Sequence, residues 1–227
     1  MDQMDLFEKN ETAASYAPPD LSGVYELSIE AYYAALHAEM SGLPIKKEIS
    51  CFVEKVGSAN DRETASRLAS DRGDPDVLAV LKTAAKVQHE IHRLTGLLRF
   101  KAEACGVYTA RCSPDYFILP ALAEHFTLRF GETPWAIIDE KRGLYLCRQN
   151  GDEAKLTELP ASGQSAARKE EGTEDPWEDP WEDPWEDPWE DLWRLYHKSI
   201  NNEGRNNPKL QRQLMPERYQ KYLPELN

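Results

Sequence analysis

The central element of the fold is predicted from residues 76–111, which read DVLAVLKTAAKVQHEIHRLTGLLRFKAEACGVYTAR. In the first part of this stretch, apolar residues recur at the three- and four-residue spacing of a helix that faces a core. They are Val77, Leu78, Leu81, Ala84, Ala85, Ile91 and Leu94. Asp74 and Pro75 fit the N-cap and the first helical position, and Thr95-Gly96 fits the end of the helix. The sequence therefore predicts one long amphipathic helix that leads into a strand.

A positively charged side runs along the same helix and continues onto the strand. Its members are Lys82, Lys86, His89, Arg93, Arg99 and Lys101. A solvated helix face is the simplest explanation, because charged stripes are common on exposed helices. The alternative is a surface for an anionic partner.

Negative charge is concentrated elsewhere in the chain. The net charge is −13, and Lys169–Asp191 supplies −11 of it through twelve acids and one Lys. Two basic islands, each with a net charge of +4, stand out from the remainder: the helix-strand island, Val80–Cys112, and the tail island, Trp193–Asn227. Clustered Lys and Arg side chains are the electrostatic signature of nucleic-acid binding. The two islands therefore predict contact with DNA.

Length and residue usage narrow the class of protein. The 227 residues are enough for one good-sized core with appendages. Apolar runs of about 18 residues are absent from the sequence, so we expect no membrane span. The acidic first ten residues, MDQMDLFEKN, resemble neither a secretory signal nor a transit peptide. We expect a cytoplasmic protein.

The four cysteines lie far apart, at Cys51, Cys105, Cys112 and Cys147. They form no C-x-x-C pair, which argues against a zinc or iron–sulfur site, so we predict no metal and no cofactor. Reduced, partly buried thiols fit a cytoplasmic protein. A Cys105–Cys112 crosslink across a hairpin is the less favoured alternative.

Four segments are expected along the chain. Residues 1–20 are predicted to be a disordered acidic tail, and residues 21–159 an α+β core. Residues 160–191 are predicted to be a disordered linker with tandem repeats. Residues 192–227 are predicted to be a basic, aromatic helical segment that completes the core.

The fold class predicted for the core is α+β, with a mainly antiparallel sheet, a long central helix and an α-rich N-terminal part. Besides the central helix, helices are expected within 21–40 after a short strand, and at 62–68, 116–130, 191–200 and 209–215. Strands are expected at 48–56, 97–101, 107–111, 135–139, 143–147 and 155–159. The strands 97–101 and 107–111 form a predicted hairpin with two open registers. One sets Arg99 opposite Arg111, which is unfavourable unless an anion lies between them, and the other sets Lys101 beside Tyr108.

The acidic linker contains four copies of Glu-Asp-Pro-Trp, from Glu174 to Trp189, and a degenerate copy that ends at Trp193. A proline in every copy excludes a helix or a central strand, and two acids per copy keep the segment solvated. A tolerated tandem expansion is the favoured interpretation. The alternative is a nucleic-acid mimic, with carboxylates for phosphates and indoles for bases, which would cover the basic islands when DNA is absent.

Several motifs, in the same order, resemble those of a bacterial domain of unknown function. The first group is Leu78, Ala85-Lys86-Val87, His89-Glu90, His92-Arg93, Gly96-Leu97-Leu98-Arg99-Phe100, Gly106-Val107-Tyr108, Leu119-Pro120, Leu122-Ala123-Glu124-His125-Phe126, Arg129-Phe130, Trp135, Ile137, Asp139 and Arg142. The second is Leu192-Trp193, Tyr196-His197, Ile200, Arg205-Asn206-Asn207-Pro208, Leu210-Gln211, Met215-Pro216, Arg218-Tyr219 and Tyr222-Leu223.

Members of that family are described as DNA metabolism or DNA repair proteins. They lie beside a radical-SAM protein of the spore-photoproduct-lyase type, and some are fused to a uracil-DNA-glycosylase-like module. The resemblance therefore implies a DNA-repair context and a partner enzyme of one of these types. The chain departs from the family pattern at Ile138 and Tyr116, where many members have His, and at Gln220, where an aromatic residue is common. Ser58–Asp74 is also shorter than the family's helical segment.

A self-contained active site is not the favoured prediction. The sequence has neither a glycine-rich phosphate loop nor the three clustered cysteines of a radical-SAM enzyme. One acid–base or metal set would require the fold to bring together His89, Glu90, His92, His125 and Asp139. For His92 and His125 a structural role is the more frequent one.

The preferred hypothesis is a DNA-binding accessory module that positions its substrate for the partner enzyme. The predicted DNA-binding residues are Lys86, His89, Arg93, Arg99, Lys101, Arg129, Arg205, Lys209, Arg212 and Arg218. Aromatic residues of the tail island could stack on bases or dock the tail on the core. The alternatives are an enzyme that acts on damaged or modified DNA bases, and a protein–protein adaptor that does not touch DNA.

Overall fold

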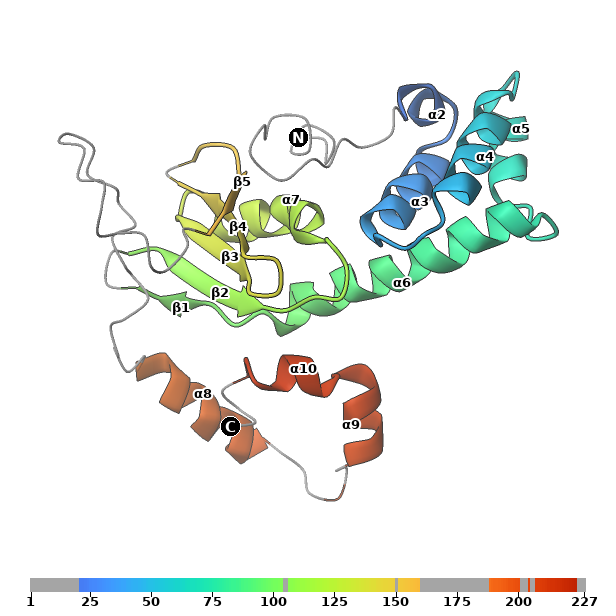
Figure 1. Cartoon of the computed structure of the whole chain (residues 1–227). Coiled ribbons are helices and arrows are strands. Elements are labelled where there is room, and N and C mark those ends of the chain that lie inside the picture. Colours follow the sequence, from blue (N-terminus) through green and yellow to red (C-terminus); the bar gives the residue numbers. More distant parts are fainter. Residues whose placement is uncertain are drawn as a thin grey trace. The chain divides into compact units, whose positions relative to one another are not determined.

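The chain divides into two compact units, which are described separately (Figure 1). The computed structural model describes residues 21–103, 106–149, 151–159, 188–200, 204 and 207–223. The first unit comprises the chain up to Gly96 together with Pro114–Glu124, and the second comprises Leu97–Ser113 and the chain from His125 onward. The expected core of residues 21–159 thus contributes to both units. The acidic tail 1–20 and residues 160–187 of the predicted linker lie outside the described residues.

From residue 21 to Leu97, the described chain consists of helices and their connections. The helices are α2 (Ser22–Leu27), α3 (Ile29–Met40), α4 (Lys46–Gly57), α5 (Arg62–Ala69) and α6 (Pro75–Leu97). The short helix predicted at 62–68 is confirmed as α5. The strands predicted at the start of 21–40 and at 48–56 are wrong, because those residues lie in α2 and α4. In α4, Ile49, Phe52 and Val56 are buried at helical spacing, and this period outweighs the β-propensity of the segment.

The long helix α6 confirms the central prediction. Asp74 caps it, since one carboxylate oxygen accepts hydrogen bonds from the backbone N–H groups of Asp76 and Val77 at 2.9 and 3.1 Å. The Lys55 ammonium also pairs with the Asp74 carboxylate. The predicted stop at Thr95-Gly96 is two residues early, because the helix continues to Leu97. Its buried side includes Val77, Val80, Ala84, Val87 and Leu94.

The largest buried side chains of the first unit include Tyr32, Phe52, Leu36 and Met40. The rings of Tyr25 and Tyr32 meet edge to face, with centroids 5.1 Å apart. His37, also on α3, is half-buried beside the Tyr33 ring. Burial lowers the pKa of His37 from 6.5 to about 4, so the imidazole is neutral at pH 7.

Acid is therefore expected to destabilise the first unit through His37. The folded pKa lies below the unfolded value, so the unfolded chain binds the proton first as the pH falls through 6.5 toward 4. The loss should reach about 2 kcal/mol between about pH 7 and pH 5. Urea unfolding at both pH values checks it. His37→Gln should remove this part of the pH dependence, and an unchanged difference would contradict the assignment.

A five-stranded sheet forms the centre of the second unit. Its strands are β1 (Lys101–Ala102), β2 (Tyr108–Cys112), β3 (Trp135–Asp139), β4 (Leu144–Arg148) and β5 (Lys155–Glu158), and they lie side by side in chain order. The β2–β3 pair is parallel, and the other three pairs are antiparallel. The α+β class with a mainly antiparallel sheet is therefore confirmed.

The connection from β2 to β3 runs through α7 (Leu119–Phe130), as a parallel pair requires. The helix predicted from Tyr116 starts three residues later, at Leu119. At its C-terminal end, Phe126 and Phe130 pack near Trp135 of β3, with ring centroids 6.2 and 6.5 Å away. Phe100 joins the same cluster, 4.7 Å from Phe130. These rings form an aromatic core beside the sheet.

Three helices follow at the C-terminal end: α8 (Pro188–Ile200), α9 (Pro208–Leu214) and α10 (Glu217–Gln220). Helix α8 starts within the last Glu-Asp-Pro-Trp copy, because proline is tolerated at a first helical position. Its large apolar residues Leu192, Leu195, Tyr196 and Ile200 are exposed.

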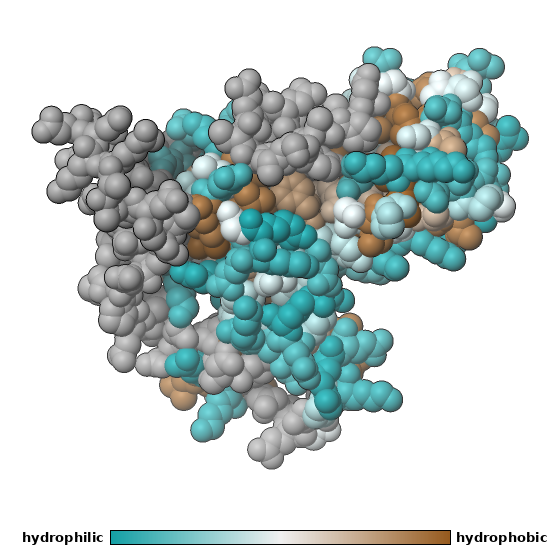
Figure 2. Space-filling model, in the orientation of Figure 1, coloured by the Kyte–Doolittle hydropathy of each residue, from teal (hydrophilic) through white to brown (hydrophobic). Residues whose placement is uncertain are grey.

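Hydrophilic residues otherwise predominate on the described surface visible in Figure 2, with smaller hydrophobic patches. Among the described residues, no helix combines the length and the apolar character needed to cross a membrane.

Candidate nucleic-acid interface

The basic side of α6 carries three cations and one histidine at helical spacing. Lys82, Lys86 and His89 are exposed, and Arg93 is half-buried. Their separations of four, three and four residues place them on one side of the helix. Within the described part of the chain, none of the four side chains forms a hydrogen bond or an ion pair. We call this set the α6 stripe.

Glu90 is the one carboxylate of α6 after Asp76, and it does not neutralise the stripe. Its side chain is buried, with 2% exposure. The two oxygens accept hydrogen bonds from the backbone N–H groups of Asp115 and Tyr116, each at 2.9 Å. Glu90 therefore holds the loop before α7, and this structural role explains why a carboxylate interrupts a basic helix.

The second unit carries the other candidate residues that precede the tail island. Lys101 of β1 is exposed and Arg99 is half-buried. His125 and Arg129, which share a side of α7 as predicted, are both exposed. The hairpin pairs Lys101 with Thr109 and Ala102 with Tyr108. If this register is extended by two residues, Arg99 lies opposite Arg111. This is the predicted register that is unfavourable unless an anion lies between the two side chains.

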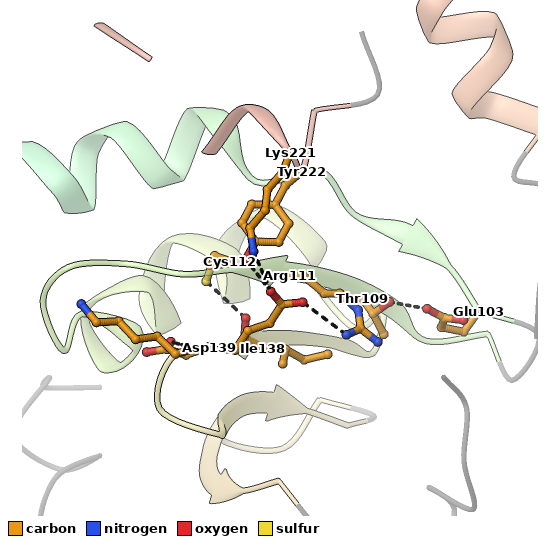
Figure 3. Close-up of polar contacts among 10 residues, drawn as sticks. Glu103, Thr109, Arg111, Cys112, Ile138, Asp139, Lys221 and Tyr222 are labelled. Atoms are coloured by element: carbon orange, nitrogen blue, oxygen red, sulfur yellow. Dashed lines mark hydrogen bonds and ion pairs between the residues drawn. The ribbon is translucent and has the colours of Figure 1, made fainter. Parts of the chain in front are cut away.

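The carboxylate of Glu140, the residue after β3, contacts Arg111, and it also contacts Lys221 and Tyr222, which are labelled with Arg111 in Figure 3. No contact of Glu140 with Arg99 is seen among the described residues. One oxygen lies 3.4 Å from Nη1 of Arg111. The other accepts hydrogen bonds from the Lys221 ammonium at 3.1 Å and the Tyr222 hydroxyl at 2.6 Å. We call Arg111, Glu140, Lys221 and Tyr222 the Glu140 cluster. It joins a member of the helix-strand island to a member of the tail island.

The parallel pairing of β2 and β3 positions the Glu140 cluster. Both strands end at the same edge of the sheet, where Cys112 lies opposite Asp139. The backbone N–H of Glu140 donates to the Cys112 carbonyl at 3.0 Å.

The Cys112 thiol is not part of a disulfide, and its Sγ donates to the Ile138 carbonyl at 3.3 Å. The alternative Cys105–Cys112 crosslink is therefore absent.

The pKa values in the cluster follow from burial and from these hydrogen bonds. Burial raises the pKa of Glu140, but the hydrogen bonds from Tyr222 and Lys221 outweigh it and leave the pKa below its usual value. Burial, and then the hydrogen bond to Glu140, raise the pKa of Tyr222 to about 12. The hydrogen bonds with Tyr222 and Glu140 raise the pKa of Lys221. At neutral pH, Glu140 is thus a carboxylate, Lys221 is an ammonium and Tyr222 carries its proton.

Part of the tail island, residues 219–223, carries buried side chains. Tyr219 of α10 and Leu223 are buried, and Tyr222 is half-buried in the Glu140 cluster. Docking is therefore the role that the structure assigns to these aromatic residues, of the two left open by the sequence. The predicted tail cations Lys209, Arg212 and Arg218 are exposed, and the Arg218 guanidinium lies over the Tyr219 ring, 4.7 Å from its centroid. Arg205 lies outside the described residues.

Asp139, a candidate for the acid–base set, has a structural role. It is completely buried, and it accepts hydrogen bonds from the backbone N–H groups of Lys141 and Arg142 at 3.0 and 3.3 Å. The Arg142 guanidinium adds an ion pair at 2.7 Å. The ring of His125, another member of that set, meets the Phe126 ring edge to face. Within the described ranges, no group of three His, Cys, Asp or Glu side chains is placed to hold a metal ion.

Sequence reasoning missed the Glu140 cluster. Its parts were visible separately, because Asp139 and Arg142 flank Glu140 in one family-like motif and Tyr222-Leu223 ends another. Glu140 and Tyr222 are 82 residues apart, however, and Glu140 and Lys221 are 81 apart. Neither spacing nor periodicity connects positions that far apart.

One family model matches residues of both units. A family model for a domain of unknown function, DUF4130, matches residues 54–225. The chain therefore belongs to this family, and the expected resemblance to an uncharacterised domain family is confirmed. The match begins within α4 and extends beyond α10. No curated protein and no solved structure matches the chain.

Proposed function

We propose that this member of the DUF4130 family is a DNA-binding accessory module. In this proposal it holds DNA for a partner repair enzyme of the radical-SAM or uracil-DNA-glycosylase type. The observation that carries the DNA-binding part is the α6 stripe: cations at helical spacing, without polar partners in the described chain, on a helix whose late carboxylate is buried. The type of partner enzyme is proposed from the resemblance of the sequence to the family described above.

The dimensions of the stripe suit a phosphate backbone. Lys82 and Arg93 are eleven residues apart on α6, which corresponds to about 16 Å along the helix axis. Duplex DNA carries one phosphate charge per strand for every ~3.4 Å of its axis. The stripe can therefore contact several phosphates. Because phosphate contacts carry no base identity, the proposal is for positioning of DNA, with binding that depends strongly on salt.

Neutralising the stripe is expected to weaken DNA binding. In the variant Lys82→Gln/Lys86→Gln/Arg93→Gln, glutamine keeps the helix propensity and length while removing the positive charge. Loss of two or three phosphate contacts should reduce affinity roughly 20- to 80-fold at about 0.2 M salt and lower the salt slope by about 2 to 3. Fluorescence anisotropy with labelled duplex and single-stranded DNA, over a salt series, measures both quantities.

The matched control removes the same charge from another exposed part of the first unit. Lys46→Gln/Lys47→Gln/Arg67→Gln changes three exposed cations on α4 and α5. It should leave both affinity and salt slope close to those of the original chain. Equal losses in the two variants would show a nonspecific charge effect, and the absence of salt-dependent DNA binding by the original chain would refute the proposed function.

A further inference from the structure

The Glu140 cluster has the composition of an anion-binding site. A guanidinium from β2, an ammonium and a phenol converge on one carboxylate, and two of these donors come from the chain segment after α10. The side chains remain accessible, with exposed fractions of 33% for Glu140, 46% for Arg111 and 57% for Lys221. A ligand from solvent can therefore reach the position of the carboxylate without opening the core.

The same three donors suit a phosphate group. Guanidinium and ammonium groups form charge-assisted hydrogen bonds with carboxylate and phosphate oxygens alike, and Arg, Lys and Tyr are among the residues that contact the DNA backbone. Within the cluster, two cationic donors and one phenol converge on a single carboxylate. The neighbouring Asp139 carboxylate pairs with Arg142.

We propose that Arg111, Lys221 and Tyr222 form a phosphate-binding site, and that the Glu140 carboxylate occupies its anion position until a phosphate replaces it. The exchange breaks the contacts of Glu140 with the three donors and forms equivalent contacts with phosphate oxygens. Glu140 lies in the turn after β3, so its released side chain can be hydrated. The inference rests on the proposed function where the phosphate is taken from a DNA backbone, and it stands without it for a free phosphate.

A permanent structural latch is the competing explanation, in which Glu140 serves to hold the end of the chain. The two explanations differ when the charge of Glu140 is removed. Glu140→Gln keeps the shape of the side chain, and its amide oxygen can still accept the Tyr222 hydroxyl. A latch predicts unchanged or weaker DNA binding in this variant. An occupied phosphate site predicts stronger binding, because the anion that competes with phosphate has lost its charge.

The decisive measurement is DNA affinity of the full chain at low salt. Glu140→Gln should bind DNA about fivefold more tightly than the original chain, since one repulsive charge is removed beside a bound phosphate. Adding Arg111→Gln should abolish the gain, and adding Tyr222→Phe, which keeps the ring but removes the hydroxyl donor, should reduce it. Glu158→Gln, the same change at an exposed position of β5, is the matched control and should have little effect. Near-UV circular dichroism verifies that each variant is folded.

Inorganic pyrophosphate provides the second probe and separates the two sources of phosphate. Calorimetric titration should show tighter pyrophosphate binding to Glu140→Gln than to the original chain, with the gain lost in Glu140→Gln/Arg111→Gln. If DNA binding depends on the α6 stripe but Glu140→Gln changes neither DNA nor pyrophosphate binding, the phosphate site is refuted and the proposed function stands. If DNA does not bind but pyrophosphate binds through Arg111, the proposed function fails and the site is a free-phosphate site. If neither probe binds, both proposals are wrong.

Discussion

Asp139→Ala is expected to lower the free energy of unfolding of the second unit by about 3 to 5 kcal/mol. The carboxylate is completely buried between two backbone N–H donors and the Arg142 guanidinium, which is 23% exposed. Alanine removes the acceptor for all three and leaves a largely buried cation without this ion pair. The loss should also loosen the turn from Asp139 to Leu144 that carries Glu140.

Urea unfolding followed by near-UV circular dichroism measures the effect of Asp139→Ala. Asp139→Asn should cost about half as much, because its amide oxygen still accepts the backbone hydrogen bonds while the charge facing Arg142 is lost. Asp152→Ala removes an exposed carboxylate of the same unit and should change stability by less than about 0.5 kcal/mol. A cost for Asp139→Ala as small as that of the control would show that the turn does not depend on this carboxylate.

Glu90→Ala is expected to cost the first unit about 3 kcal/mol. Two backbone N–H groups, those of Asp115 and Tyr116, lose a charged acceptor at 2.9 Å, and hydrogen bonds to charged groups contribute about 1.5 to 3 kcal/mol each. The two hydrogen bonds together would contribute about 3 to 6 kcal/mol. Water can reach the loop from the exposed side of Asp115, so we expect the cost to lie at the lower end, about 3 kcal/mol.

Hydrogen exchange gives the local measurement for Glu90→Ala, because the amides of Asp115 and Tyr116 should lose protection before the amides of α6 do. Glu90→Gln retains one acceptor oxygen and should have an intermediate effect. Glu63→Ala, at an exposed position of α5, is the control for charge alone. Retained protection of both amides in Glu90→Ala would mean that their hydrogen bonds to Glu90 contribute little to stability.

Local patterns in the sequence were enough to predict the elements that depend on neighbouring residues. The period of apolar residues in α6 and its Asp74 cap both act over a few positions, and this helix was correctly predicted. Residues 48–56 were misassigned because Ile49, Phe52 and Val56 satisfy helical spacing while the segment also has the β-branched residues of a strand. Packing of the first unit selected the helix.

The same distinction between local and long-range patterns applies to the candidate sites. The α6 stripe was visible in the sequence because helical spacing alone places Lys82, Lys86, His89 and Arg93 on one side. The Glu140 cluster was not visible, because it requires the parallel β2–β3 pair and a chain end that returns to the sheet. The structural roles of Glu90 and Asp139 were equally hidden, since a carboxylate that accepts backbone N–H groups resembles a catalytic one in sequence.

The division of the chain into units also sets the order in which they can be completed during synthesis. The polypeptide passes from one unit to the other after Gly96, after Ser113 and after Glu124. A ribosome therefore delivers β1 and β2 before the last piece of the first unit, and β2 must wait for β3 to gain its parallel neighbour. Domains generally fold from the N-terminus as they emerge, but here neither unit is encoded by one uninterrupted stretch. Arg111 and Glu140 consequently remain without Lys221 and Tyr222 until the 82 residues that follow Glu140 have been translated.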